Sequence, residues 1–428
     1  MDALIRSLSR RVFVKAGALS LVSLGFDPLF LGRAAYAQRV PVRGTGSKVL
    51  VCIFQRGAVD GLSMVVPYAD DWYYRERSRI VVPRPGTAPD AALDLDGRFG
   101  LHPRLGALKP LFDAGHLAIV DAVGSPDGTR SHFDAQDYME TGTPGEKATR
   151  DGWLNRCLAH DREHRDTPFR GVAMGPELPR ALQGSAPALA IADLQAFGIR
   201  APEPARDRLA EAFEQLWGAS GVGAGVIANT AAESFEAIRQ LRSANPGQYR
   251  PEGGADYPPG PFGRALLQVA QLIKADLGAE ILFVDVGGWD THVNQGNGGA
   301  GQLAVRLDDF GRSLAAFSQD LGERMADVVV LTMSEFGRTV HENGNAGTDH
   351  GHATAMFVLG GPVRGGRVVG RWPGLAPEQR YQQRDLEVTT DFRDLFGEVV
   401  ARHLGVGQLD VIFPGYQLAP ERFPGVLA

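Results

Sequence analysis

The chain has 428 residues and a formal net charge of −6 at neutral pH, with 44% apolar and 22% charged residues. These values are ordinary for a soluble globular protein. The acidic balance argues against nucleic acid or an anionic membrane surface as the main partner. The length suits one large domain or two ordinary ones.

The N-terminal segment has the three zones of a secretory signal. Its basic zone contains the run Ser9-Arg10-Arg11-Val12-Phe13-Val14-Lys15, which fits a twin-arginine signal. An apolar stretch at residues 16–31 follows, shorter than the roughly 20 residues that span a bilayer. Ala35-Tyr36-Ala37 then forms a small-x-small cleavage site.

This segment predicts export by the twin-arginine machinery and removal of residues 1–37. The mature protein is then periplasmic or secreted, with no stable membrane insertion. A protein exported in the folded state can also load a cofactor before it leaves the cytoplasm. The alternative is an amphipathic first helix that contains a chance arginine pair.

Apolar runs bounded by Gly, Asp or Pro predict buried strands at residues 48–54, 117–122, 187–192, 280–286, 327–333 and 355–359. Apolar periodicity of 3.6 predicts helices at residues 103–114, 205–217, 230–243, 262–275, 301–321 and 390–404. Strands that alternate with helices favour an α/β fold with a mainly parallel central sheet and helices on both faces.

We expect residues 38–428 to form a single α/β domain with insertions. Residues 245–260 contain Asn-Pro-Gly and Pro-Pro-Gly and predict a loop. The polar segment at residues 143–180 predicts an excursion over the surface. Cys52 and Cys157 are too few for a cysteine-based metal site. They can pair in an oxidising compartment, but two such distant cysteines are more often buried thiols.

Ligands of open α/β sheets bind beyond the carboxyl ends of the strands. Three predicted strand ends and one glycine-containing loop supply metal-binding side chains: Asp60; Asp290 and His292; Glu335; and Asp349, His350 and His352. Mixed oxygen and imidazole ligands suit Zn, Mn or Fe, and all-oxygen sites suit Ca or Mg. The convergence of four segments predicts a site for one or two divalent ions.

Each of these residues also has an ordinary structural interpretation. Asp60 begins a good turn, Asp290 can cap a helix, and Glu335 can pair with Arg338. A single histidine in a loop is usually solvated or hydrogen-bonded. Only the convergence of the set favours a metal site over these alternatives.

Ser131 is a candidate nucleophile because it precedes a predicted short helix. The N-terminal end of a helix carries partial positive charge and free N–H groups that can hold an anion. The alternative is a helix cap, since Asp134 follows three residues later.

The chain resembles the DUF1501 family over essentially its whole mature length. The segments that carry this resemblance are residues 49–62, with Gln55-Arg56-Gly57-Ala58-Val59-Asp60-Gly61, and residues 130–142, 287–292, 334–339, 349–350 and 411–415. Members are commonly exported by the twin-arginine route. The family is placed in the alkaline phosphatase-like superfamily, together with sulfatases, and the resemblance therefore implies an alkaline phosphatase-like fold.

The resemblance also implies roles for individual residues. Asp60 matches the metal ligand after the first strand, and Ser131 lies near the position of the nucleophile. Asp290 and His292 resemble the ligands of the second metal. The residues Asp349, His350 and His352 resemble the closing histidine region.

One position departs from the superfamily pattern. The usual Asp-His pair after the fifth predicted strand is replaced by Glu335-Phe336. Glutamate can bind a metal ion and phenylalanine cannot, so one metal position lacks a ligand or is rebuilt from His350 and His352.

The main hypothesis is an exported metal-dependent hydrolase of phosphate or sulfate esters, acting on a small anionic substrate. Ser131 would attack the ester and Arg56, Arg130 or Arg338 would hold its anionic group. Arg56 is the preferred clamp because it lies in the same turn as Asp60. The alternatives are a non-catalytic exported protein with at most a structural metal, and a metal-dependent enzyme of different chemistry.

Overall fold

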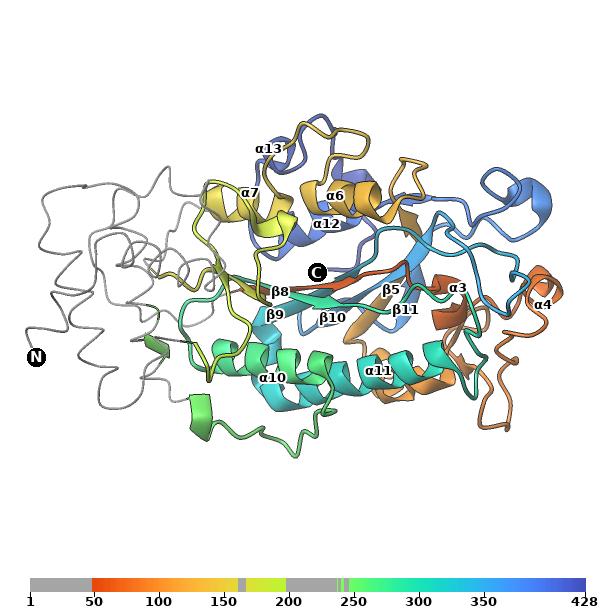
Figure 1. Cartoon of the computed structure of the whole chain (residues 1–428), viewed down its shortest axis with the longest axis horizontal. Helices are drawn as coiled ribbons and strands as arrows, with labels where there is room; N and C mark the ends of the chain where they lie inside the picture. Colours follow the sequence, from red (N-terminus) through yellow and green to blue (C-terminus); the bar gives the residue numbers. More distant parts are fainter. Residues whose placement is uncertain (1–47, 161–166, 198–236, 238–239, 242–245) are drawn as a thin grey trace, which may run out of the picture.

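The computed structural model describes residues 48–160, 167–197, 237, 240–241 and 246–428 (Figure 1). The predicted signal at residues 1–37 lies outside these described residues, as do the helix predicted at 205–217 and most of the one predicted at 230–243. In the described part of the chain, no helix combines the length and the apolarity that crossing a membrane requires.

A nine-stranded sheet forms the centre of the described structure. Its strand order is β11 (Arg367–Val369), β5 (Leu117–Gly124), β10 (Thr354–Gly360), β9 (Val328–Met333), β1 (Val49–Gln55), β8 (Ile281–Val286), β6 (Gly171–Met174) and β7 (Leu189–Ala190), with β12 (Thr390–Asp391) also paired to β5. Only the pairs that β10 makes with β5 and β9 are antiparallel. The predicted mainly parallel sheet is therefore confirmed.

Strand β1 shows why the strands read as unbroken apolar runs. All seven of its residues are buried. Val51 and Ile53 pack into the core on one face of the sheet, and Cys52 and Phe54 pack into the core on the other. Both faces are covered, so the sequence shows no alternation of polar and apolar residues.

Helices cover both faces of the sheet (Figure 1). One face carries α10 (Pro261–Lys274) and α11 (Gln302–Leu321), with η2 (Pro103–Leu108) and α5 (Lys109–Asp113). The other face carries α6 (His132–Thr141), α7 (Trp153–His160), α12 (Phe392–Arg402) and α13 (Leu409–Ile412). The predicted α/β class with helices on both faces is confirmed.

Shorter elements complete the described chain. A small sheet contains β2 (Val65–Val66), β3 (Leu93–Asp94) and β4 (Gly100–Leu101), and α3 (Gly61–Met64) and α4 (Asp71–Glu76) lie beside it in the sequence. The remaining 3-10 turns are η3 (Arg180–Leu182), η4 (Pro246–Gln248), η5 (Gly322–Asp327), η6 (Pro377–Gln379) and η7 (Pro420–Arg422).

The predicted surface excursion at residues 143–180 is wrong, because α7 is buried and β6 belongs to the central sheet. Two polar side chains in α7 led to the prediction that this segment lies on the surface. Asn155 donates to the Leu182 carbonyl at 2.8 Å, and Arg156 donates from Nε to the Ile412 carbonyl at 2.9 Å. Buried polar groups that find backbone acceptors in this way can occupy a core helix.

Both cysteines are free and buried, which agrees with the interpretation as thiols rather than a disulfide. Cys52 lies in β1 and Cys157 in α7. Burial raises the pKa of both thiols, so they remain protonated at neutral pH.

The topology brings several chain segments to one edge of the sheet. Strands β1, β8 and β9 are parallel and end there, whereas β10 is antiparallel and begins there. Ser334, after β9, donates from Oγ to the Gln55 carbonyl at 2.8 Å and accepts from the Val59 amide at 3.1 Å. Thr354, at the start of β10, donates to the Val59 carbonyl at 3.2 Å. These bonds fix the segments that carry the predicted site.

Candidate metal centre

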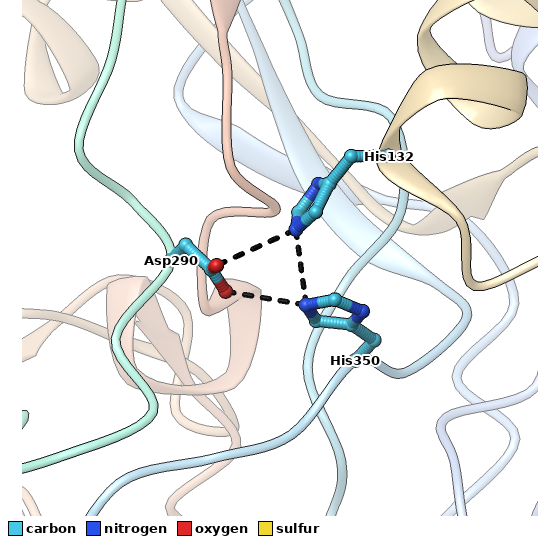
Figure 2. Close-up of side chains that lie close together, drawn as sticks. All are labelled: His132, Asp290 and His350. Carbon is cyan, nitrogen blue, oxygen red and sulfur yellow. Dashed lines mark hydrogen bonds and ion pairs between the residues drawn. The ribbon is translucent and has the colours of Figure 1, made fainter.

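Two histidines and one aspartate converge at this edge (Figure 2). His132 is the first residue of α6, Asp290 follows β8, and His350 precedes β10. His350 Nε2 lies 3.2 Å from Asp290 Oδ1 and 3.0 Å from His132 Nε2. His132 Nε2 lies 3.6 Å from Asp290 Oδ2. One ligand atom from each residue lies within 4.8 Å of the other two, so the three could hold one metal ion.

His292 stands at the border of this group. Its Nε2 lies 2.9 Å from Asp290 Oδ1 and 3.0 Å from His350 Nε2. It does not belong to the set in which every ligand atom lies within 4.8 Å of every other. Three imidazole Nε2 atoms therefore face the carboxylate of Asp290, and His292 approaches from one side of the other two.

The second ring nitrogen of each histidine has its own acceptor. His132 Nδ1 lies 2.8 Å from Glu335 Oε1, and His292 Nδ1 lies 3.0 Å from Asp349 Oδ1. His350 Nδ1 lies 2.9 Å from the backbone carbonyl of Arg130. These acceptors hold the proton of each neutral ring on Nδ1 and leave a lone pair on Nε2. Metal-binding histidines have this second hydrogen bond almost without exception.

The surroundings of Asp290 keep its carboxyl ionised. Burial alone would raise the pKa of Asp290, but the guanidinium of Arg338 outweighs it and lowers the pKa. Arg338 Nη1 lies 2.7 Å from Asp290 Oδ1, and the Arg338 side chain is fully buried. With neutral imidazoles, the Nε2 lone pairs meet a negative carboxylate without protons to join them. A divalent cation would satisfy all of these acceptors at once.

The two histidines of the group differ in basicity. The hydrogen bond to Glu335 and its charge raise the pKa of His132 above its usual value, although burial acts in the opposite direction. Burial lowers the pKa of His350, as do the nearby charges of His132 and Arg338. His350 is therefore neutral at pH 7 and available as a ligand, whereas His132 is the first of the pair to take up a proton as the pH falls.

Glu335 and Asp349 lie behind the imidazoles rather than beside Asp290. Glu335 is fully buried, and its Oε1 also accepts from the Gly57 amide and from Gln136 Nε2, both at 2.8 Å. Burial would raise the pKa of Glu335, but these bonds and the bond to His132 lower it. The structure therefore makes both acids hydrogen-bond partners of histidines, where the sequence predicted metal ligands.

Asp60 is also separate from the group. Its side chain is fully buried, and its Oδ2 lies 2.6 Å from Arg77 Nη1 and 2.6 Å from Gln295 Nε2. Burial would raise the pKa of Asp60, but Arg77 and these bonds lower it. Gln295 continues through Thr348 to Arg338, so Asp60 supports the site from one layer behind it. Donors meet Oδ2, whereas Oδ1 is buried and has no hydrogen-bond partner in the described part of the chain, so the ligand role of Asp60 stays a prediction.

His352 packs away from the imidazoles of the site, on Tyr381, whereas Phe336 packs against them. His352 is buried and stacks on Tyr381 with ring centroids 4.1 Å apart, so the structure does not gather it with His350 as a ligand. Burial lowers the pKa of His352 to about 4. Phe336 lies 5.0 Å from His132 and 5.1 Å from His350, measured between ring centroids. This phenylalanine fixes the two imidazoles by packing.

Ser131 is the N-cap of α6, and it immediately precedes His132. Its hydroxyl accepts from the Asp134 amide at 3.5 Å, a long contact for a hydrogen bond. The capping interpretation is therefore present in the structure, with weak geometry. Ser131 is exposed to solvent, and its placement next to His132 keeps it at the edge of the site.

The predicted anion clamps are bound to carboxylates. Arg56 contacts Glu140 Oε1 at 2.9 Å from Nη1 and also pairs with Asp285 through Nε. Arg130 contacts Asp385 Oδ2 at 2.6 Å. These pairs explain why the predicted role of Arg56 finds no support in the arrangement of its guanidinium.

His132 was not predicted as a candidate ligand, although it lies in the segment 130–142 that carries the family resemblance. The signal was available: a histidine at the first position of a helix that starts after a strand of a mainly parallel sheet. Ser131 drew attention because it is a familiar nucleophile, while the helix start points the next side chain toward Asp290 (Figure 2). Gln136, one turn later, was also missed, and it binds Glu335.

The chain matches a known protein family over most of its length. The sequence profile of DUF1501, described as a protein of unknown function, matches residues 116–412. No curated relative matches the chain. Solved structures with a general likeness include the PsFucS1 sulfatase from Pseudoalteromonas sp., with 12% identity, 89% of this chain and 73% of that chain covered, and a TM-score of 0.40.

Two further structures have a weaker likeness. The C-terminal periplasmic domain of EcEptC from Escherichia coli, solved in complex with Zn, has 10% identity and a TM-score of 0.32, with 74% of this chain and 73% of that chain covered. The phosphonate monoester hydrolase of Agrobacterium radiobacter has 10% identity and a TM-score of 0.31, with 86% and 78% covered. At these scores the site itself has to carry the functional argument.

Proposed function

The chain belongs to the DUF1501 family, and from its site we propose that it is a metal-dependent hydrolase of phosphate or sulfate esters. The observation that carries the proposal is the convergence of imidazole Nε2 atoms on the Asp290 carboxylate while each Nδ1 is held by a separate acceptor. Hydrogen bonds alone do not explain why so many lone pairs meet at one point.

We infer one ion at this site, held by His132, Asp290 and His350, with His292 as the nearest further ligand. The imidazole ligands favour Zn, Mn or Fe over Ca. Among the described residues no second group of this kind gathers, since Arg77 pairs with Asp60 Oδ2 and hydrogen-bond donors meet Glu335. When bound, the ion would act as a Lewis acid on an oxygen of the ester.

The residues of the chain have separate tasks in this proposal. Arg338 keeps Asp290 ionised and oriented, and Glu335 holds His132 in the tautomer that presents Nε2. Ser131 remains the proposed nucleophile, because it is exposed, directly precedes His132 and has only a long hydrogen bond to restrain its hydroxyl. Twin-arginine export to the periplasm or the medium, from the signal at residues 1–37, belongs to the same proposal.

A structural role for the metal, in a non-catalytic protein, is the second candidate. One observation favours it: Arg56, the predicted substrate clamp, is bound to Glu140 and Asp285. A catalytic site for an anionic ester needs a cationic group that is free to bind the substrate.

The experiment measures metal binding and hydrolysis on the full chain. Calorimetry and elemental analysis with Zn²⁺, Mn²⁺ and Fe²⁺ are expected to give one ion per chain. His350→Ala and His132→Ala should weaken binding by more than about 100-fold, the upper end of the loss from removing a residue that only supports a ligand. His341→Ala is the matched control, because its side chain is 69% exposed and pairs with Glu76.

Hydrolysis of aryl phosphates, phosphodiesters and sulfate esters then separates the two candidates. The catalytic proposal expects metal-dependent turnover that Ser131→Ala reduces by orders of magnitude, with metal binding unchanged. Metal binding without any turnover would leave the structural role. If His350→Ala, His132→Ala and His341→Ala bind the metal with equal affinity, the proposal of a metal site at these residues is wrong.

A further inference from the structure

Arg306 lies on α11 close to the strand end that carries Asp290. A Cβ atom built on Gly288 would lie 2.3 Å from Arg306 Nη1 and 2.4 Å from its Cζ. The guanidinium therefore occupies the space where a side chain at residue 288 would stand. Gly288 is two residues before Asp290, a separation of at most about 7 Å between Cα atoms.

Arg306 differs from the other arginines around the site in having no carboxylate partner within the described ranges. Its Nε is buried and has no hydrogen-bond acceptor. The others are paired as follows: Arg56 with Glu140 and Asp285, Arg77 with Asp60, Arg130 with Asp385, and Arg338 with Asp290. A buried donor without an acceptor is uncommon in folded proteins, and here it belongs to a guanidinium with no ion pair to a described carboxylate.

The backbone below this guanidinium also offers donors. Gly287 and Gly288 are exposed, and neither amide donates a hydrogen bond to another described residue. Gly288 has a φ of 90°, and any side chain there would displace Arg306. Consecutive free N–H groups in such a turn bind anions, and a guanidinium beside them adds charge and a planar pair of donors.

We propose that Arg306 and the Gly287–Gly288 turn form the subsite for the anionic group of the substrate, a phosphate or a sulfate. The inference deepens the proposed function and rests on it for the identity of the substrate. It assigns to Arg306 the role that the sequence had suggested for Arg56. Phosphate and sulfate both present oxygens that match the fork of a guanidinium.

The experiment measures the binding of inorganic phosphate and inorganic sulfate by calorimetry. It uses the full chain as purified and after chelation, because Arg306 needs no metal ion to bind an anion. Arg306→Gln should weaken binding of the preferred anion about tenfold or more, as expected for the loss of a charged hydrogen bond. Arg306→Lys keeps the positive charge but lacks the planar pair of donors. Its anion affinity should lie between those of the wild type and Arg306→Gln.

Arg312→Gln is the matched control on the same helix, because Arg312 is half exposed and makes only distant ion pairs of 3.7 and 3.9 Å. Its anion affinity should stay within about twofold of the wild type, the scale of a weak surface interaction. Thermal unfolding of each variant checks that the fold is intact. If the wild type binds neither anion, or if Arg306→Gln binds as tightly as Arg312→Gln, the subsite is wrong.

Failure of the subsite and failure of the proposed function give different results. If metal-dependent hydrolysis is lost in His350→Ala but unchanged in Arg306→Gln, the proposed function is supported and the proposed subsite is wrong. Anion binding that depends on Arg306 in a protein without turnover keeps the binding subsite and removes the hydrolase.

Discussion

Asp60 and Asp290 follow neighbouring parallel strands, yet their surroundings are opposite in kind. Asp60 is fully buried, and the groups that meet its Oδ2 are donors, the Arg77 guanidinium and the Gln295 amide. The Asp290 side chain is 43% exposed, and apart from Arg338 the groups that meet it are imidazole nitrogens with lone pairs. Arg77 balances the charge of the first carboxylate, although its Oδ1 has no partner among the described residues, and the second carboxylate meets an excess of acceptors.

The comparison shows that the type of a side chain does not identify a metal ligand. Under our proposal, Asp290 is a ligand because other acceptors converge with it, whereas Arg77 and Gln295 bind Oδ2 of Asp60. A third aspartate, Asp121 in β5, extends the series: it is buried, and its Oδ2 has neither donor nor acceptor. Burial raises the pKa of Asp121 to about 7, so this carboxyl is about half protonated at neutral pH in the folded protein.

The largest expected effect on stability comes from removal of the ion pair between Asp60 and Arg77. Arg77→Met leaves a carboxylate that is fully buried without its counter-charge. Removal of one partner of a buried ion pair typically costs about 3–5 kcal/mol of the free energy of unfolding. Urea unfolding at neutral pH measures this loss.

Arg84→Met is the control for the removal of an arginine. Arg84 and its partner Asp71 have side chains that are 48% and 71% exposed, so the change should cost about 1 kcal/mol or less. Equal losses for the two variants would contradict the distinction between Asp60 and an ordinary surface carboxylate.

The second effect is a pH dependence that originates at Asp121. Its folded-state pKa of about 7 is higher than its unfolded value, so the folded state binds the proton more tightly. Between about pH 4 and pH 7 the folded state is protonated and the unfolded state is not, and stability falls as the pH rises. Above pH 7 this contribution is constant.

Asp121→Asn should remove this slope. From pH 5 to pH 8, wild-type stability should fall by about 2–3 kcal/mol more than that of the variant, since each pKa unit corresponds to about 1.4 kcal/mol. Urea unfolding at several pH values measures the difference, with Asp71→Asn as an exposed control. A slope that is the same in all three proteins would mean that Asp121 is ionised in the folded state.

The strands could be predicted because burial on both faces makes them continuous apolar runs. All six predicted strands are present, with ends that differ by a few residues. Strand β6 was missed because only four residues, Gly171–Met174, form it within a polar segment. The helix predicted at residues 103–114 is present as η2 followed by α5, whose first turn contains Pro110.

The site could be predicted as a set of segments but not as a set of ligands. A strand end gave Asp290, and the glycine-containing loop before the last predicted strand gave His350, because topology decides where these segments lie. The division between ligands and supporting residues depends on partners far away in the sequence, as in the pairing of Asp60 with Arg77 and of Glu335 with His132. No local pattern encodes these pairings, since they follow from how loops pack over the sheet edge.

The smallest effect concerns the acids behind the imidazoles, and it tests whether they act through the histidines. Glu335→Gln removes the charge that faces His132 Nδ1 from a fully buried position, and it should weaken metal binding about 10–100-fold. Asp349→Asn should weaken binding less, because Asp349 is 53% exposed and supports His292 at the border of the group.

The pKa of His132, measured by NMR titration of the metal-free protein, tests whether Glu335 acts by positioning this imidazole. The hydrogen bond to Glu335 is the main cause of the raised pKa of His132, so Glu335→Gln should return that pKa toward its usual value. A lower metal affinity with the His132 pKa unchanged would show that Glu335 acts on the fold as a whole and not through this imidazole.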